Sequence, residues 1–257
     1  MRYVFLLITL LSSYLIVAQS KTAYPAFEQH TFTSHRGFQL SYRLMPPLQV
    51  DTSRRYPLVL GLHGAGSRGE SNEKILKHLS PIFLADTNRS KYPCYVLIPQ
   101  CPKDQQWVTV PWTAASHTLP QQPSEPLAAS LALLDSLTKV YPIDTTRLYL
   151  IGFSMGGFGV WDAAMRFPYK FAAAIPICGG GDETAAHRIQ HLPMWVFHGM
   201  LDKTVQPLRS IHMVEKLKQL GGKPRYTWYP TVAHTAWKQA FKEPDLLPWL
   251  FRQKNSK

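Results

Sequence analysis

The chain has 257 residues, of which 45% are hydrophobic, 12% aromatic and 17% charged. This profile supplies enough apolar residues for one sizeable core and excludes disordered and fibrous proteins. The formal net charge is +12, but the basic residues are dispersed, with their densest groups at residues 53–55 and 252–257. We therefore expect a solvated basic surface and no nucleic-acid partner, with attraction to an acidic polysaccharide or an anionic envelope as the alternative.

The N-terminal segment, residues 1–18, has the layout of a secretory signal peptide. Arg2 precedes an uncharged, mostly apolar run from Tyr3 to Ala18, and small and polar residues follow. The alternative is an uncleaved anchor, but the run falls short of the ~20 apolar residues that a spanning helix needs. We expect cleavage near Ala18 or Ser20 and a secreted or periplasmic protein that does not stay inserted in a membrane.

The remaining residues, 19–257, contain no repeat and no low-complexity segment, so we predict a single domain. Its first element is an antiparallel hairpin. Apolar side chains alternate with polar ones over residues 38–44, which predicts a half-buried strand that pairs with residues 26–34 across a turn.

The rest of the domain alternates short apolar strands with helices. The expected strands, almost continuously apolar as burial on both faces requires, lie at residues 56–64, 95–100, 147–154, 171–179, 194–199 and 225–230. Residues 124–142 and 209–222 have apolar side chains at helical spacing. This alternation predicts the α/β class, with a mostly parallel, doubly wound sheet, helices on both faces, and ligands at the carboxyl ends of the strands.

Residues 151–159, IGFSMGGFG, surround one serine with glycines between a predicted strand and a predicted helix. The pentad from Gly152 to Gly156 matches G-x-S-x-G, the nucleophile elbow, in which a strained turn exposes the serine hydroxyl at the top of a sheet. A Cβ at either glycine would collide with the neighbouring strand or helix. Ser154 is therefore the predicted nucleophile, and it needs an adjacent imidazole that a carboxylate orients.

His234 and Asp202 are the predicted partners of Ser154. Each follows one of the last two strands, and the chain order serine, acid, histidine is the one expected with a nucleophile elbow. Asp182, after the preceding strand, is the competing acid, because a carboxylate there could also reach the histidine.

Ester or amide cleavage also develops an oxyanion that needs preorganised N–H donors. Met155, directly after the serine, offers one backbone N–H. The HGAG turn at residues 63–66 offers a second from Ala65 or Gly66. The alternative for HGAG is a plain turn between a strand and a helix.

Four further side chains have structural interpretations. His198 lies at a strand end, where a histidine more often braces a loop than acts as a base. Asp162 lies within the helix after the elbow, and we expect it at the surface or in a cap. We assign Trp161 and Trp237 to packing.

The three cysteines are predicted to be free thiols. Cys94 and Cys101 flank an extended run that separates their Cα atoms far beyond the 7 Å that a disulfide allows, and Cys178 ends another strand. No C-x-x-C or H-E-x-x-H spacing occurs. We therefore expect no metal site, and the proposed chemistry needs no cofactor.

The long irregular segment at residues 101–126 holds two tryptophans after a strand end. Trp107 and Trp112 are candidate substrate-binding residues that could form an aromatic platform, the alternative being that they anchor the loop to the core. His63 is included with them, although a histidine at a strand end more often braces a loop.

The sequence resembles the α/β-hydrolases of the secreted esterase group that includes feruloyl esterases, acetyl-xylan esterases and polyhydroxybutyrate depolymerase-like proteins, some of them labelled predicted peptidases. The motifs that carry the match are LHGAGSRGESN, GFSMGGFGVWDAA, FAAAIPICGGGD, WVFHGMLDKTV and VAHTAW. The resemblance covers residues 38–251 and implies one α/β-hydrolase domain over residues 19–257. It also implies Ser154, Asp202 and His234 as the catalytic triad.

The resemblance also points to an open site. Lids in these hydrolases typically lie between the strands that here end at Cys178 and begin at Met194, and residues 179–193 leave no room for a lid domain. An open site suits an ester on a polymer. We expect a secreted serine carboxylesterase that acts on small-molecule or polysaccharide esters of the acetyl or feruloyl type. The alternatives are a serine peptidase with the same triad and a non-catalytic carbohydrate-binding protein.

Overall fold

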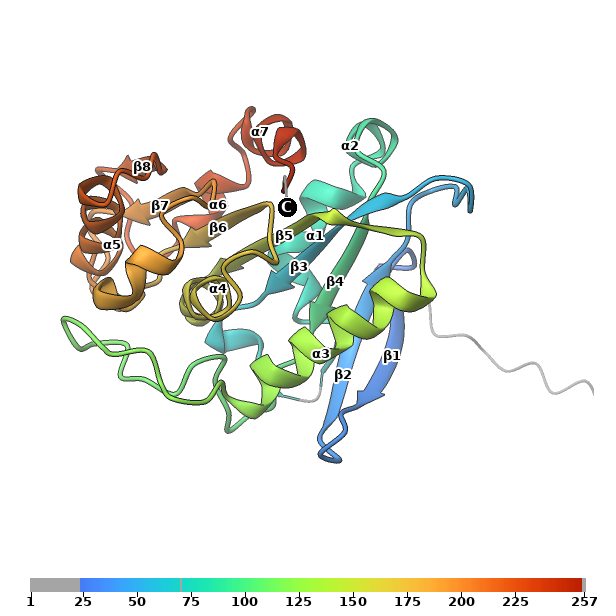
Figure 1. The fold of residues 1–257 in the computed structure, drawn as a ribbon, viewed down its shortest axis with the longest axis horizontal. Coiled ribbons are helices and arrows are strands. Elements are labelled where there is room, and N and C mark those ends of the chain that lie inside the picture. The colour runs from blue at the N-terminus through green and yellow to red at the C-terminus, as the bar shows by residue number, and fades with distance from the viewer. Residues whose placement is uncertain (1–23, 70, 256–257) are drawn as a thin grey trace, which may run out of the picture.

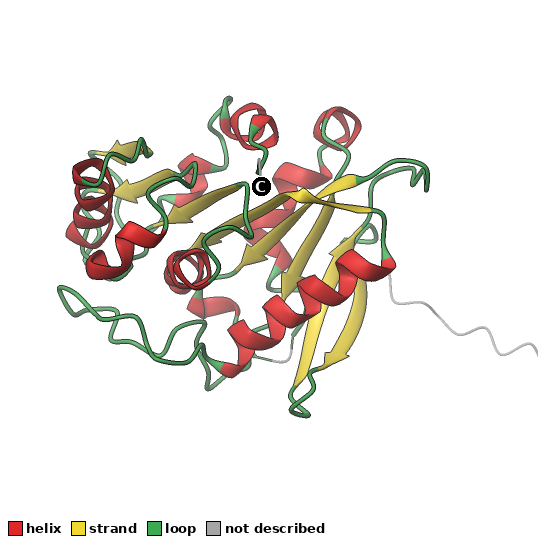
Figure 2. Cartoon of the chain, in the orientation of Figure 1, coloured by secondary structure: helices red, strands yellow, loops and turns green. Residues whose placement is uncertain are grey.

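The computed structural model describes residues 24–69 and 71–255, so the predicted signal peptide lies outside the described residues. The described chain forms an eight-stranded sheet in the order β1-β2-β4-β3-β5-β6-β7-β8, with helices packed on both sides (Figures 1 and 2). No helix in this part of the chain is long and apolar enough to cross a membrane.

The sheet begins with the predicted hairpin. Strands β1 (Glu28–Thr33) and β2 (Gln39–Met45) pair antiparallel, and Gly37 in the turn between them has a φ of +81°, which glycine adopts without steric cost. Strand β2 also pairs antiparallel with β4 (Tyr95–Pro99), so the hairpin forms one edge of the sheet.

The remaining strands are all parallel, as the alternation of strands and helices predicts. They are β3 (Tyr56–Leu62), β5 (Ile143–Phe153), β6 (Ala173–Ile177), β7 (Trp195–Gly199) and β8 (Arg225–Tyr229). Strands β3, β4, β6 and β7 are buried along their whole length. Strand β8 departs from the expected burial on both faces: as the edge strand it leaves Arg225 and Tyr226 exposed.

The helices divide between the two faces of the sheet (Figure 1). One apolar layer joins alternate residues of β3 and β5 to α3 (Glu125–Val140), α4 (Met155–Arg166) and α5 (Leu208–Gln219). The opposite layer holds the intervening residues, including Val59 and Ile151, and α1 (Leu76–Leu84), α6 (Trp237–Ala240) and α7 (Leu246–Arg252). The prediction of a doubly wound sheet is confirmed, and the period of two along each strand decides which layer a side chain joins.

The connections contain three short elements. They are the 3₁₀ helix η1 (Ala65–Ser67), the helix α2 (Asp86–Lys91) and the 3₁₀ helix η2 (Glu183–Arg188). Because the segment between β6 and β7 holds only η2, no lid domain is inserted there.

Candidate active site

Ser154 lies on a sharp turn between β5, which ends at Phe153, and α4, which begins at Met155. Its backbone has a φ of +56° and a ψ of −123°, a conformation that non-glycine residues adopt only when their surroundings enforce it. The Ser154 N–H donates to the Ile177 carbonyl at 2.9 Å, and the Ser154 carbonyl accepts from the Gly157 N–H at 2.8 Å. The strain and these two bonds fix the position of the hydroxyl.

The glycines of the pentad are required by close backbone approach. A Cβ at Gly152 would overlap the Gly156 carbonyl, and a Cβ at Gly156 would overlap the Leu62 carbonyl of β3. The predicted collision with the neighbouring strand and helix is confirmed. The two glycines therefore let α4 start close against the centre of the sheet, directly behind the serine.

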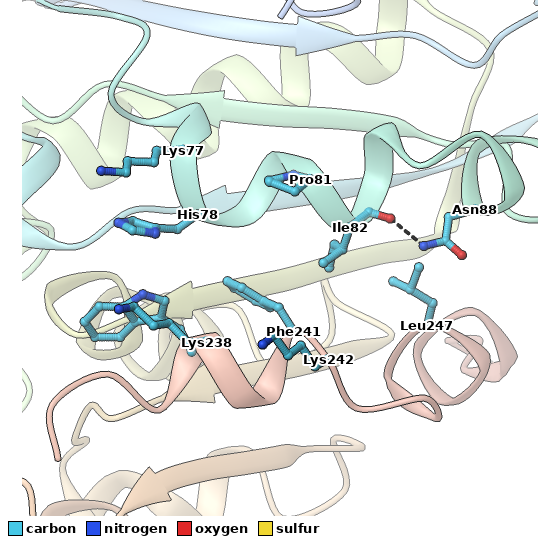
Figure 3. A pocket seen from close by; sticks show the side chains of 10 residues that line it. Lys77, His78, Pro81, Ile82, Asn88, Lys238, Phe241, Lys242 and Leu247 are labelled. Carbon is cyan, nitrogen blue, oxygen red and sulfur yellow. Dashed lines mark hydrogen bonds between the residues drawn. The ribbon is translucent and has the colours of Figure 1, made fainter. Parts of the chain in front are cut away.

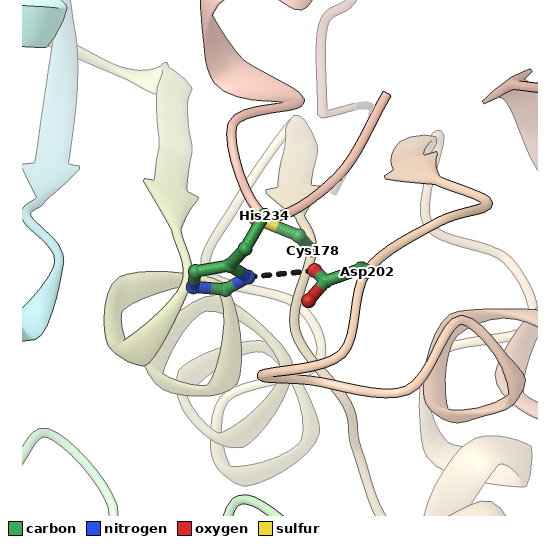
Figure 4. Close-up of side chains that lie close together, drawn as sticks. All are labelled: Cys178, Asp202 and His234. Atoms are coloured by element: carbon green, nitrogen blue, oxygen red, sulfur yellow. Dashed lines mark hydrogen bonds and ion pairs between the residues drawn. The ribbon is translucent and has the colours of Figure 1, made fainter. Parts of the chain in front are cut away.

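Ser154, His234 and Asp202 form one hydrogen-bonded chain. The Ser154 Oγ lies 2.8 Å from His234 Nε2, and His234 Nδ1 lies 2.6 Å from Asp202 Oδ2. Figure 4 shows the imidazole and the carboxylate facing each other from the loops after β8 and β7. Transfer of the hydroxyl proton to His234, whose charged form the Asp202 carboxylate stabilises, can turn the serine into a nucleophile, which is the chemistry required for acyl transfer.

The two loops that supply the imidazole and the carboxylate are tied together by main-chain bonds. The Leu201 N–H donates to the Val232 carbonyl at 3.0 Å. A Cβ at Gly199 would overlap the carbonyls of Val232 and Ala233, so glycine at the end of β7 admits the loop that precedes His234. The distance between His234 and Asp202 is therefore set by backbone packing as well as by their side chains.

Asp202 is a buried carboxylate with several hydrogen-bond donors. Its Oδ1 accepts from the N–H groups of Thr204 at 2.9 Å and Val205 at 3.0 Å. Burial alone would raise the pKa of the Asp202 carboxyl, but hydrogen bonds from His198, His234 and Val205 outweigh burial and hold that pKa well below its usual range. Asp202 is thus ionised at neutral pH and can hold the Nδ1 proton of the imidazole.

His198 lies against the other side of the same carboxylate. Its fully buried Nε2 is 3.2 Å from Asp202 Oδ2 and 3.0 Å from the Val205 carbonyl, and both of these atoms are acceptors. Nε2 therefore carries a proton. Its Nδ1 lies 2.7 Å from Ser210 Oγ, which donates to the Gly179 carbonyl at 2.9 Å. His198 therefore braces a loop, as predicted, and the group that it holds is the Asp202 carboxylate.

The predicted oxyanion donors lie beside Ser154. Met155 is the first residue of α4, where an N–H has no acceptor within the helix. Ala65 and Gly66 line the same cavity as Ser154. A Cβ at Gly64 would lie 2.9 Å from the Phe153 ring and 3.5 Å from Ser154 Cβ, so glycine lets the turn pass against the elbow. The arrangement can present two N–H groups to one oxygen.

The cavity above Ser154 has a volume of about 470 Å³, and two tryptophans line it. One is Trp112, as predicted for the long loop. The other is Trp237, which packs edge-to-face on His234 with ring centroids 5.5 Å apart. The sequence-based assignment of Trp237 to packing missed its place in the wall of this cavity. Its position three residues after His234 could have indicated that it lies near the site.

Trp107 and His63 lie in the core rather than in the cavity. Trp107 is fully buried, and its indole N–H donates to the His63 carbonyl at 2.9 Å. The His63 ring accepts from the Cys101 N–H at 3.0 Å, and burial lowers its pKa to about 4. These placements leave neither side chain a surface for substrate, so the predicted binding role does not fit them. Both instead position the strand ends that carry the HGAG turn and the long loop.

Asp182, the buried Arg209 and the partly buried Arg166 hold the long loop against the sheet. Asp182 Oδ2 accepts from the Leu119 N–H at 2.7 Å, so this carboxylate faces the loop and not His234. Arg209, fully buried in α5, donates to the Ala114 carbonyl at 2.6 Å. Arg166 in α4 donates to the Pro120 carbonyl and pairs with Asp162 at 2.5 Å.

The expected surface position of Asp162 is wrong. This residue is 2% exposed because it holds the Arg166 guanidinium that reaches the long loop.

The three cysteines are buried and free, as predicted. Cys178 approaches the site most closely: its sulfur and ligand atoms of Asp202 and His234 all lie within 4.8 Å of one another (Figure 4). These three groups would be the candidate metal ligands in the described chain. Burial raises the pKa of the Cys178 thiol well above its usual range, which keeps it protonated. His234 Nδ1 and Asp202 Oδ2 are hydrogen-bonded to each other. These three side chains therefore suit a hydrogen-bonded pair beside a neutral thiol better than a metal site.

Comparisons with known proteins place these features in a wider group. The sequence profile of the dienelactone hydrolase family matches residues 110–244. A region of 71 residues is 39% identical to the bifunctional acetylxylan esterase/xylanase XynS20E of Neocallimastix patriciarum and covers 27% of this chain and 10% of that protein.

Among solved structures, a thermostable esterase is 38% identical with a TM-score of 0.83 over 89% of this chain and 63% of its own. The chain thus spans less than two thirds of that relative's length. A ferulic acid esterase has a TM-score of 0.66 at 16% identity, over 88% of this chain and 98% of its own. The acylaminoacyl peptidase of Pyrococcus horikoshii has a TM-score of 0.67 at 14% identity, over 90% of this chain and 43% of its own. The last two likenesses show the α/β-hydrolase fold.

Proposed function

The chain belongs to the dienelactone hydrolase family, and from that premise we propose that it is a serine carboxylesterase. The observation that carries this proposal is the unbroken hydrogen-bonded chain from Ser154 Oγ through His234 to the ionised Asp202. The identity shared with the thermostable esterase and with XynS20E supports an ester as the substrate.

The mechanism follows from the atoms of the site. The Ser154 hydroxyl gives its proton to His234 Nε2 while its oxygen attacks the ester carbonyl carbon. The carbonyl oxygen becomes an oxyanion that accepts from the N–H groups of Met155 and Ala65 or Gly66. His234 then gives the proton to the departing alcohol, which leaves an acyl-enzyme. Water, deprotonated by His234, attacks the acyl carbon and releases the acid and Ser154.

We propose an acyl group on carbohydrate, of the acetyl or feruloyl type, as the natural target. No lid domain is inserted between β6 and β7, Trp112 and Trp237 line the cavity that holds Ser154, and aromatic faces bind sugar rings and phenolic acids. The names of XynS20E and of the ferulic acid esterase point in the same direction. Secretion or a periplasmic location belongs to this proposal, since it rests on the signal-like residues 1–18.

The first test is hydrolysis of 4-nitrophenyl acetate by the wild type and by Ser154→Ala. We expect kcat to fall by about 10⁴-fold or more, because the remaining groups cannot form an acyl-enzyme. Ser53→Ala, in an exposed turn before β3, is the matched control and should retain full activity. A serine-directed sulfonyl fluoride should add its mass to the wild type and to the control but not to Ser154→Ala.

The outcomes separate the alternatives. Equal hydrolysis by the wild type and Ser154→Ala would refute Ser154 as the nucleophile. Cleavage of peptide 4-nitroanilides with higher kcat/KM than esters would make the protein a peptidase. Binding of acetylated xylan without turnover, unchanged in Ser154→Ala, would make it a carbohydrate-binding protein.

A further inference from the structure

A second cavity of about 440 Å³ adjoins the one that holds Ser154. It lies between α1 and α6, and Figure 3 shows Lys77, His78 and Pro81 on the first helix facing Lys238 on the second and Phe241 and Lys242 directly after it. The two cavities share Lys77, His78 and Trp237 as lining residues. A ligand that extends from the serine past Trp237 therefore enters the second cavity directly.

The floor between the two cavities is aromatic. Trp237 packs on Phe153 with ring centroids 4.8 Å apart, and the His78 ring meets Phe153 edge-to-face at 5.6 Å. Phe241 extends the same cluster into the second cavity, at 6.3 Å from Phe153. The rings of Trp237, His78 and Phe241 meet Phe153 tilted or edge-to-face, so the cluster offers both ring faces and ring edges for apolar contact with sugar rings.

The rim of this floor is cationic. Lys77, Lys238 and Lys242 line the second cavity, and Lys74 lines the first. No aspartate or glutamate of the described residues lines either cavity, and none of the four lysines forms an ion pair within that part of the chain. Exposed lysines commonly pair with carboxylates at a protein surface, so four together without one leave a local excess of positive charge.

The field of these lysines reaches the floor. The pKa of His78 is lowered mainly by burial and further by the charges of Lys77 and Lys238. Both ammonium groups therefore act on the same ring. His78 is then neutral at pH 7 and can offer one ring N–H and one acceptor nitrogen. The groove formed by the two adjoining cavities thus has an uncharged aromatic floor and a cationic rim.

We propose that the cavity between α1 and α6 binds a carboxylate-bearing sugar unit next to the esterified one, so that the natural substrate is an acylated acidic polysaccharide. This inference rests on the proposed function. The aromatic side chains would bind the sugar rings, and the lysine ammonium groups would bind the carboxylates. Because each ammonium lies on a flexible stem, the lysines tolerate variation in the spacing of the carboxylates. Because Lys238 and Lys242 line only the second cavity, beyond Trp237, they act on the polymer and not on the acyl group.

The test compares two forms of one polymer. Acetylated glucuronoxylan oligosaccharide is assayed beside the same material with its carboxylates converted to neutral methylamides, which leaves the acetyl esters in place. We expect kcat/KM to be about tenfold higher for the acidic form at low salt, since exposed ion pairs contribute a few-fold each. The advantage should disappear near 1 M salt, where the screening length is about 3 Å.

Variants locate the effect in the groove. Lys238→Met with Lys242→Met keeps the alkyl stems, removes two charges and should reduce the preference for the acidic form several-fold. Lys238→Arg with Lys242→Arg should keep it. Lys139→Met with Lys223→Met removes two exposed charges outside the groove and is the matched control for net charge.

An equal kcat/KM for the two polymers, or an equal loss in the groove and control pairs, would overturn the inference. Serine-dependent hydrolysis of 4-nitrophenyl acetate by the wild type keeps this result distinct from a failure of the proposed function. Preferential binding to anionic lipid vesicles, with no preference between the two polymers, would also overturn it.

Discussion

Replacing Asp202 with asparagine exchanges one carboxylate oxygen for an amide nitrogen, and the surroundings decide where that nitrogen goes. The Oδ1 position faces the backbone N–H groups of Thr204 and Val205, which can only donate. The amide oxygen must therefore take that position, and the NH₂ group must face His234 Nδ1. It then donates to Nδ1 and places the imidazole proton on Nε2, opposite the Ser154 hydroxyl.

The expected magnitude follows from this forced tautomer. An imidazole that carries its proton on Nε2 cannot accept the serine proton, and the same substitution in serine-protease triads costs about 10⁴ in kcat. Folding also weakens by about 1–3 kcal/mol, because the His198 N–H loses one of its two acceptors and faces the new NH₂ group.

The wild type and Asp202→Asn should also differ in how stability depends on pH. The lowered pKa of Asp202 means that its charged form stabilises the fold above about pH 4, and that this contribution is lost as the pH falls through the lowered value. The variant lacks this contribution at every pH. The gap in unfolding free energy between the two proteins should therefore narrow below about pH 4.

The assay is kcat for 4-nitrophenyl acetate across the pH range, with nitrogen NMR of the His234 ring to read the tautomer directly. Asp182→Asn is the control, because its carboxylate holds the Leu119 N–H of the long loop and does not face the imidazole. We expect less than a tenfold loss in the control. Activity of Asp202→Asn within tenfold of the wild type, or an Nδ1 proton retained in its spectrum, would refute the reasoning.

Two further predictions concern the support of the site. Gly156→Ala should lower the free energy of unfolding by about 3 kcal/mol or more in urea titrations, since its Cβ overlaps the Leu62 carbonyl; a loss below about 1 kcal/mol would contradict the packing described. Trp112→Ala should raise KM for aryl and glycosyl esters several-fold with little change in thermal stability, because its ring lines the cavity. Trp107→Phe should instead lower thermal stability and leave KM nearly unchanged, because Trp107 is buried in the core. Equal changes in KM for the two variants would refute this division of roles.

The sequence predicted the parts of the fold that depend on local patterns. The continuous apolar runs follow from burial on both faces, and the structure confirms them in β3, β4, β6 and β7. The half-buried strand expected over residues 38–44 is confirmed only in part, because Arg43 of β2 is also buried, where it donates to the Phe27 and Asn72 carbonyls. Strand β8 differs because its edge position is a property of the sheet order, which no local pattern contains. The helices α1 and α2 fell outside the sequence-based prediction.

The candidate site divides along the same line. The chain order and strand ends predict that Ser154, Asp202 and His234 meet, and the structure brings them within hydrogen-bond distance; their catalytic roles stay predictions. Trp107 and Trp112 cannot be told apart by composition, because only the path of the loop sends one into the core and the other into the cavity. Asp162 was misplaced for a similar reason, since its partner Arg166 is pulled inward by carbonyls of a distant loop.

The anchoring of the long loop has a consequence for how such a protein can change. Arg68, Arg209 and Arg166 belong to the scaffold, and they donate to main-chain carbonyls of the loop, those of Gln105, Ala114 and Pro120, so that Trp112 lies between the first two anchors. Every residue has a main-chain carbonyl, so the side chains between the anchors can be exchanged while the hydrogen bonds to the arginines are kept. The segment that carries Trp112 is therefore an interchangeable cassette, on which new surfaces can be displayed to the serine without rebuilding the domain beneath.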